Sequence, residues 1–256
     1  MRLERDSLER QLGELDGEIG TVRAALEAAE ADAARFAEEH AALVRTWEDL
    51  ERYPWPDLRG IDARQLEYYE RHLPPDMGVY HTVKIWEVVR EPLGFESFCT
   101  AMYEQPELID EVIRRVGEFH LALPRLLCDF RCTAAVYGAD DYAYKTSTMM
   151  APGYIIEKFL PWHERMAALA HAQGTMYFFH CCGQIDAIMD DFNDDVRIDA
   201  KHSFEDTILP VTEAKKRYGD RVALLGGIDM DFLIRGDEAA IRRRVRETLE
   251  VCHPGG

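Results

Sequence analysis

From residue 133 onward, short apolar runs alternate with amphipathic segments, and this rhythm constrains the fold more than any other feature of the sequence. Strands that alternate with helices pair in parallel through right-handed crossovers. We therefore predict an α/β fold, built either as an open doubly wound sheet or as a (β/α)8 barrel. No G-x-G-x-x-G follows any predicted strand, so a dinucleotide-binding fold has no support. The predicted strands are 134–137, 175–179, 196–200 and 221–225, and the predicted helices are 152–172, 184–192, one that opens at Pro210, and others that run through Val251.

The preceding part of the chain has a different pattern. Apolar residues alternate four and three apart from Leu8 to Phe36, and this heptad repeat predicts one long helix over residues 1–46. Two interpretations stay open: a helix that joins two copies into a homodimer, or a helix or frayed arm of its own domain. Two prolines within residues 53–57 end it, so we assign 1–46 as a heptad helix or arm and 47–256 as the barrel domain. Early in that domain we predict a strand at 79–83 and helices within 94–131.

Composition narrows the functional classes. Of 256 residues, 47% are hydrophobic, which is enough for a sizeable core, and the net charge of −18 argues against a nucleic-acid or anionic-membrane surface. The N-terminus lacks the apolar stretch of a signal peptide, and no apolar run approaches roughly 18 residues, so we expect a cytoplasmic protein without a membrane span. The six cysteines fit a reduced protein better than a disulfide scaffold. A small-molecule substrate remains the expected ligand.

The most informative local stretch runs from Phe178 to Gly183. Its apolar residues predict a buried strand, and the glycine ends it. Side chains two apart in an extended chain point to the same side, so His180 and Cys182 can converge on one metal ion while Cys181 points toward the core. An imidazole and a thiolate are ligands suited to zinc. The sequence therefore predicts a zinc site at this strand tip.

The neighbouring predicted strands also end in polar residues. In a parallel barrel all C-terminal strand ends face one rim, where the chemistry is done, so we expect a shared active site. Simpler interpretations stay open, because the paired aspartates could cap a loop, Glu205 could be solvated, and Asp229 could be a helix N-cap. The candidates are Asp140, Asp141, Glu205 and Asp229 for catalysis, Lys201 and His202 for cofactor binding, and His180 and Cys182 for metal binding.

Several of these segments resemble the uroporphyrinogen decarboxylase superfamily, which also contains the zinc-dependent methylcobamide:thiol methyltransferases. The resemblance covers roughly residues 50–256 and implies a TIM-barrel-like fold with its site at the C-terminal rim. The segments that carry it are Gly138–Tyr142, 151–162, His180–Gly183, Gly226–Asp229 and Pro254–Gly256.

Two departures from the family pattern matter. The decarboxylases bind substrate carboxylates with paired arginines, and Arg59 and Arg64 lack that context here. The methyltransferases match His180 and Cys182 but carry a further cysteine after a glycine run, whereas Cys252 precedes the glycines and is not assigned as a ligand. We therefore expect a barrel that is incomplete at both ends, lacking the first strand and the last βα unit.

Three functional hypotheses follow. In the leading one, a methyltransferase-like enzyme transfers a methyl group from a corrinoid, free or on a partner protein, to a thiol activated by zinc. Glu205 would be an additional ligand or base, Asp140 or Asp141 would orient the substrate, and Asp229 would lie at the rim. The second is a metal-free carboxy-lyase of the uroporphyrinogen decarboxylase type, acting in porphyrin metabolism, in which Asp140 or Asp141 stabilises a protonated pyrrole. The third is a non-catalytic interaction protein that uses the heptad arm.

Overall fold

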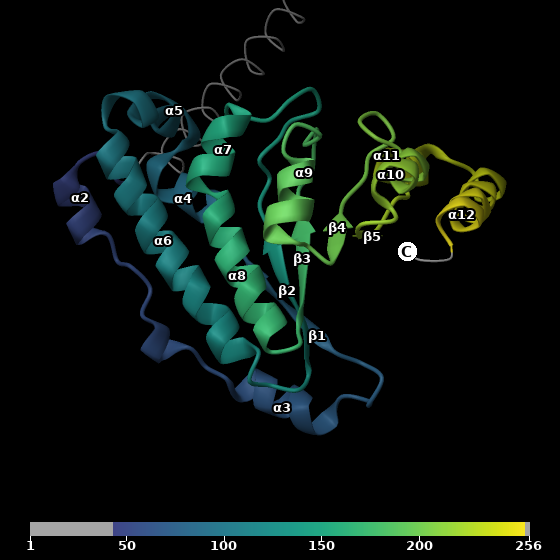
Figure 1. Cartoon of the computed structure of the whole chain (residues 1–256), viewed down its shortest axis with the longest axis horizontal. Coiled ribbons are helices and arrows are strands. Elements are labelled where there is room, and N and C mark those ends of the chain that lie inside the picture. Colours follow the sequence, from purple (N-terminus) through teal and green to yellow (C-terminus); the bar gives the residue numbers. More distant parts are fainter. Residues whose placement is uncertain (1–42, 254–256) are drawn as a thin grey trace, which may run out of the picture. The chain divides into compact units, whose positions relative to one another are not determined.

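The computed structural model describes residues 43–253, so the predicted heptad helix lies almost wholly outside the described residues. The chain divides into two units, and the second begins at Val44. The second unit is built on a five-stranded parallel sheet (Figure 1). Its strands are β1 (Val79–Val83), β2 (Thr133–Ala139), β3 (Met176–His180), β4 (Ala200–His202) and β5 (Ala223–Leu224).

The strands lie in the sheet in the same order as in the sequence, β1-β2-β3-β4-β5. A doubly wound sheet reverses its strand order at a switch point, whereas the sheet of a (β/α)8 barrel advances by one neighbour after each helix. The order therefore gives the barrel type of α/β fold, present here as an incomplete, unclosed barrel. The register pairs Ala139 with His180 and His180 with His202, so three strand ends meet at one edge.

Helices connect and cover the strands. α6 begins with Pro106 at its first turn, where a missing backbone N–H costs nothing. The described helices are α2 (Trp47–Arg52), η1 (Leu58–Gly60), α3 (Arg64–His72), α4 (Trp86–Leu93), α5 (Phe95–Glu104), α6 (Pro106–Leu127), α7 (Pro152–Lys158), α8 (Leu160–Ala172), α9 (Met189–Asp191), the π-helix η2 (Phe192–Val196), α10 (Val211–Tyr218), α11 (Met230–Arg235) and α12 (Glu238–Cys252). Within residues 43–253, no helix is long and apolar enough to cross a membrane.

The core lies between the sheet and the helices α6 and α8, which pack side by side (Figure 1). Alternation along β3 shows how the strand is used. Tyr177 and Phe179 are fully buried toward the helices, whereas Met176 is 43% exposed and Phe178 is half-buried on the opposite face. His180 follows Met176 and Phe178 in this alternation. The two-residue period that buries Tyr177 and Phe179 therefore also places His180 on the open face of the sheet.

Three predicted elements were wrong in extent. The helix predicted over 152–172 is two helices with a junction at Phe159, because Pro161 has no N–H with which to continue α7. The helix predicted over 184–192 begins only at Met189. The strand predicted over 196–200 is displaced to Ala200–His202, because Arg197 takes a left-handed conformation that ends η2.

Candidate active site

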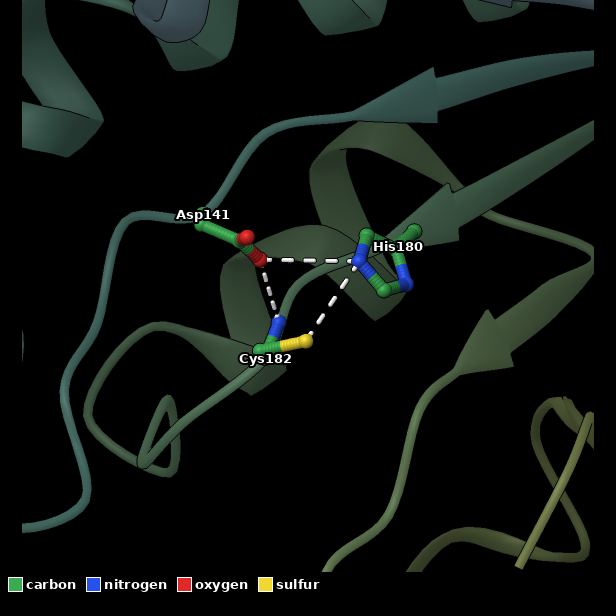
Figure 2. Close-up of side chains that lie close together, drawn as sticks. All are labelled: Asp141, His180 and Cys182. Atoms are coloured by element: carbon green, nitrogen blue, oxygen red, sulfur yellow. Dashed lines mark hydrogen bonds and ion pairs between the residues drawn. The ribbon is translucent and has the colours of Figure 1, made fainter. Parts of the chain in front are cut away.

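Three side chains converge at the C-terminal edge of the sheet (Figure 2). Asp141 follows β2, His180 ends β3, and Cys182 lies two residues further on. The Nε2 atom of His180 is 3.5 Å from Cys182 Sγ and 3.6 Å from Asp141 Oδ1. One ligand-type atom from each of the three residues lies within 4.8 Å of the other two.

Local backbone contacts hold this cluster together. The N–H of Cys182 donates to Asp141 Oδ1 at 2.6 Å, which ties the loop after β3 to the loop after β2. Gly183 follows with φ +91°, and a Cβ there would meet the carbonyl oxygen of Ala143 at 2.5 Å. Glycine is therefore needed for both the backbone conformation and the close approach. The turn that ends β3 thus also positions the thiol.

The imidazole of His180 is suited to metal binding. Burial lowers its pKa, and Lys201 and Lys84 lower it further, against the opposing effect of Asp141. The ring is therefore neutral at neutral pH, with one nitrogen lone pair free to bind a cation. Because His180 is only partly buried, a ligand can reach it from solvent.

The thiol of Cys182 is protonated at neutral pH in the metal-free protein. Burial raises its pKa, and the hydroxyl of Ser203, with its Oγ 3.5 Å from the sulfur, acts in the opposite direction. A bound metal ion would reverse this balance, because coordination deprotonates a thiol. The sulfur is half-buried and faces His180 rather than the core.

The donor set fits zinc. Imidazole nitrogen, thiolate sulfur and carboxylate oxygen bind zinc at roughly 2.0–2.3 Å, and tetrahedral ligands at such lengths lie about 3.5 Å apart. The separations of His180 Nε2 from Cys182 and Asp141 match that edge. Three protein ligands and one open position are what a catalytic zinc site requires.

Cys181 is fully buried in the core, as its position in the strand predicted. Its sulfur accepts from the backbone N–H of Tyr142 at 3.3 Å, and burial raises its pKa to about 12. The adjacent cysteines therefore have opposite surroundings. Cys181 is an inert packing residue, and Cys182 faces the candidate metal site.

The two adjacent aspartates also separate. Asp140 is fully buried and accepts from the backbone N–H groups of Ile85 (2.8 Å) and Glu87 (3.1 Å), and it lies 3.2 Å from His163 Nε2. Burial opposes its ionisation, but these hydrogen bonds bring its pKa below the ordinary value. Asp140 therefore ties the end of β2 to the start of α4, and it lies outside the three-residue cluster.

Lys201 is buried beneath the site. Its ammonium donates to the carbonyls of Cys181 (3.0 Å), His202 (2.8 Å) and Ser203 (3.0 Å). Burial lowers its pKa to about 8. All three of its donors are used in holding the loops after β3 and β4, rather than in facing a cofactor.

Glu205 and Asp229 lie on later loops of the same edge. Asp229 caps α11 through the N–H groups of Asp231 (2.8 Å) and Phe232 (3.3 Å), and it also accepts from Asp206 N–H at 2.9 Å. Glu205 lies 4.0 Å from Lys145 Nζ and contributes to the raised pKa of Cys182. Neither belongs to the three-residue cluster.

A pocket adjoins the cluster on the side of β4. Its wall includes Gly183, Lys201, Ser203 and Glu205, together with apolar residues such as Ile208 and Leu209. None of the three cluster residues lines this small pocket, which approaches the cluster through Ser203, whose Oγ lies 3.5 Å from the sulfur of Cys182. The sequence pattern places Ser203 among the polar residues at the end of this strand but assigns it no role, and the structure brings its hydroxyl to the sulfur of Cys182.

Comparison with known proteins adds a family and a fold. A family described as uroporphyrinogen decarboxylase (URO-D) matches residues 88–256, more than half of the chain. A solved structure of a "methyltransferase from Methanosarcina mazei" is similar in fold, with a TM-score of 0.60 and 18% sequence identity over 72% of this chain. The similarity covers 53% of that methyltransferase chain, or about half its length. Comparison with curated proteins gave no match.

Proposed function

We infer the function of this chain from the family to which it belongs, the uroporphyrinogen decarboxylase (URO-D) family. We propose that it is a methyltransferase-like enzyme of that family, in which Asp141, His180 and Cys182 hold zinc and a corrinoid supplies a methyl group to a thiol. The observation that carries the proposal is the convergence of an imidazole, a thiol and a carboxylate on one point at the C-terminal edge of the sheet. That edge is where barrel enzymes place their chemistry.

When bound, a zinc ion supplies Lewis acidity, which lowers the pKa of a substrate thiol toward neutrality. The chain's own residues prepare the site for that role. His180 is neutral and contributes a lone pair, Asp141 contributes a carboxylate, and Cys182 would contribute a thiolate once coordination removes its proton. The hydroxyl of Ser203 lies within reach of the cysteine sulfur.

The proposed reaction is the transfer of one methyl group from the corrinoid to the sulfur of the thiol. In the proposed transfer the thiol would lose its proton to solvent and its sulfur would bond to the methyl carbon, and the corrinoid, as the methyl donor, would keep the electron pair of the bond that breaks. The protein has to orient the sulfur toward the methyl group and exclude competing nucleophiles. The partly exposed position of Cys182 and His180 is compatible with a large methyl donor approaching from the open side of the edge.

The decarboxylase alternative receives less support from the described residues. Arg59 and Arg64, the nearest sequence candidates for binding substrate carboxylates, are exposed and form ion pairs with Asp57 and Asp62. Asp141, the carboxylate that faces the site, accepts the N–H of Cys182. We therefore treat decarboxylation as an outcome that the functional test must distinguish.

The test is a methyl-transfer assay on the purified chain with zinc, methylcobalamin and a panel of small thiols. Loss of methylcobalamin absorbance with formation of the methyl thioether is expected for the wild-type protein and for Cys181→Ala, and it should be lost in Cys182→Ala. A parallel incubation with uroporphyrinogen and no metal tests the alternative. Carbon dioxide release there, with no thioether formed in the first assay, would overturn the proposal.

A further inference from the structure

The two ring nitrogens of His180 have different neighbours. Nε2 faces Cys182 and Asp141, and Nδ1 lies 2.6 Å from the Nδ1 atom of His202. A neutral imidazole carries a proton on only one nitrogen. Because metal binding at Nε2 requires a lone pair there, the proton of His180 must then sit on Nδ1, and its partner at that position becomes important.

The fold holds His202 where it can be that partner. The two histidines are directly paired across β3 and β4, and their ring centroids lie 4.9 Å apart with the ring planes inclined by 30°. Gly226, which follows β5, leaves room for the ring, because a Cβ on Gly226 would lie 3.1 Å from an atom of His202. The ring of Tyr137 lies on the other side, with its centroid 6.3 Å away.

We propose that His202 is a positioning residue: its Nδ1 accepts the Nδ1–H of His180 and so leaves the Nε2 lone pair of His180 aimed at the metal position. The metal-related part of this assignment rests on the proposed function, and the tautomer of His180 does not. Hydrogen bonds from the second nitrogen of a ligating histidine fix its tautomer and its orientation in metal sites generally.

The surroundings of Nε2 favour this direction of the hydrogen bond. In the opposite arrangement Nε2 would carry the proton and face Asp141 Oδ1 at 3.6 Å, beyond a good hydrogen bond, while that oxygen already accepts the N–H of Cys182. With a lone pair on Nε2, the S–H of Cys182 can donate to it across 3.5 Å. The chain of donors then runs from Cys182 to His180 to His202.

A matched pair of variants separates acceptor from bulk. In His202→Asn, the side-chain oxygen takes the place of Nδ1 and still accepts a hydrogen bond, whereas His202→Leu has a similar branched shape and no acceptor. The leucine variant should bind zinc roughly 10- to 100-fold more weakly than wild type, as found for outer partners of metal ligands, and the asparagine variant should recover most of that loss. Zinc affinity is measured by competition with a chromogenic chelator, with circular dichroism as the control for folding.

Nitrogen-15 NMR of the histidine rings in the metal-free protein provides an independent readout. We expect His180 to carry its proton on Nδ1 in wild type and His202→Asn, and to lose that preference in His202→Leu. Finding the proton on Nε2 of His180 in wild type would overturn the assignment, as would equal zinc affinity in the leucine and asparagine variants. If wild type binds no zinc but shows the Nδ1 tautomer, the proposed function fails and the hydrogen-bond assignment stands.

Discussion

The sulfur of Cys182 lies 3.5 Å from Nε2 of His180, whereas Cys181, which stands between them in the chain, is fully buried. Extended backbone sends alternate side chains to opposite faces, and this alternation continues past the last residue of β3. The same short run therefore fills the core with one cysteine and presents another beside the histidine. The positions of His180 and Cys182 relative to each other are therefore set by the local backbone. Asp141 joins them from the loop after β2, which is distant in the sequence.

Asp141→Asn tests the third ligand. Removing the negative charge should weaken zinc binding at least roughly tenfold, because losing even a residue that only supports a metal ligand typically costs that much. The free energy of unfolding should change little, because Asp141 is partly exposed. Chelator competition and thermal unfolding of the same preparation check both expectations. Unchanged zinc affinity would remove Asp141 from the ligand set.

Asp140→Asn, one residue earlier, should lower the stability of the fold and have little direct effect on zinc binding. The buried carboxylate accepts from Ile85, Glu87 and His163, so its neutral replacement should lower the free energy of unfolding by about 3 kcal/mol. The folded pKa of Asp140 lies below its ordinary value, so the ionised group stabilises the fold above that ordinary value, and the contribution is lost as pH falls through the folded pKa. Denaturant unfolding at neutral pH measures the cost, and a loss smaller than that of Asp141→Asn would contradict the assignment.

His120 should make the fold sensitive to mild acid. Burial lowers its pKa from 6.5 to about 4, so the unfolded chain takes up a proton in this range before the folded one does. Stability from this group is complete above pH 6.5 and falls as the pH drops toward 4, by roughly 3 kcal/mol in total.

The control variant for this effect is His120→Asn, which keeps an acceptor for the N–H of Lys84 and does not titrate in this range. Free energies of unfolding at pH 7, 5.5 and 4 should decline more steeply in wild type than in the variant. Parallel pH profiles for the two proteins would show that His120 does not contribute.

Asp229→Ala should affect local structure more than metal binding. Losing the N-cap of α11 costs about 1 kcal/mol, and the bond to Asp206 N–H adds to that loss. Zinc affinity should stay close to the wild-type value. A large loss of zinc with unchanged stability would place Asp229 in the site instead.

Some of this arrangement could be predicted from the sequence because it depends on local patterns. The βα rhythm and the opposite directions of Cys181 and Cys182 follow from periods of 3.6 and two residues. The junction between α7 and α8 was missed because apolar periodicity continues across Phe159, although the proline two residues later signals the break.

The choice between Asp140 and Asp141 could not be made from the sequence. Both are aspartates at one strand end, and contacts with distant residues separate them: Ile85 and His163 for the first, Cys182 for the second. The role of Lys201 also could not be predicted from the sequence. Its place at a predicted strand end suggested a role with a cofactor, and only the folded loops reveal three carbonyls around its ammonium group.

The central claim is that His180 and Cys182 hold zinc, and elemental analysis of protein purified without added metal tests it most directly. We predict about one zinc per chain in wild type and in Cys181→Ala, and little or none in His180→Ala and Cys182→Ala, because only the outward-facing cysteine approaches the histidine. Full zinc occupancy in the His180→Ala protein would contradict the account.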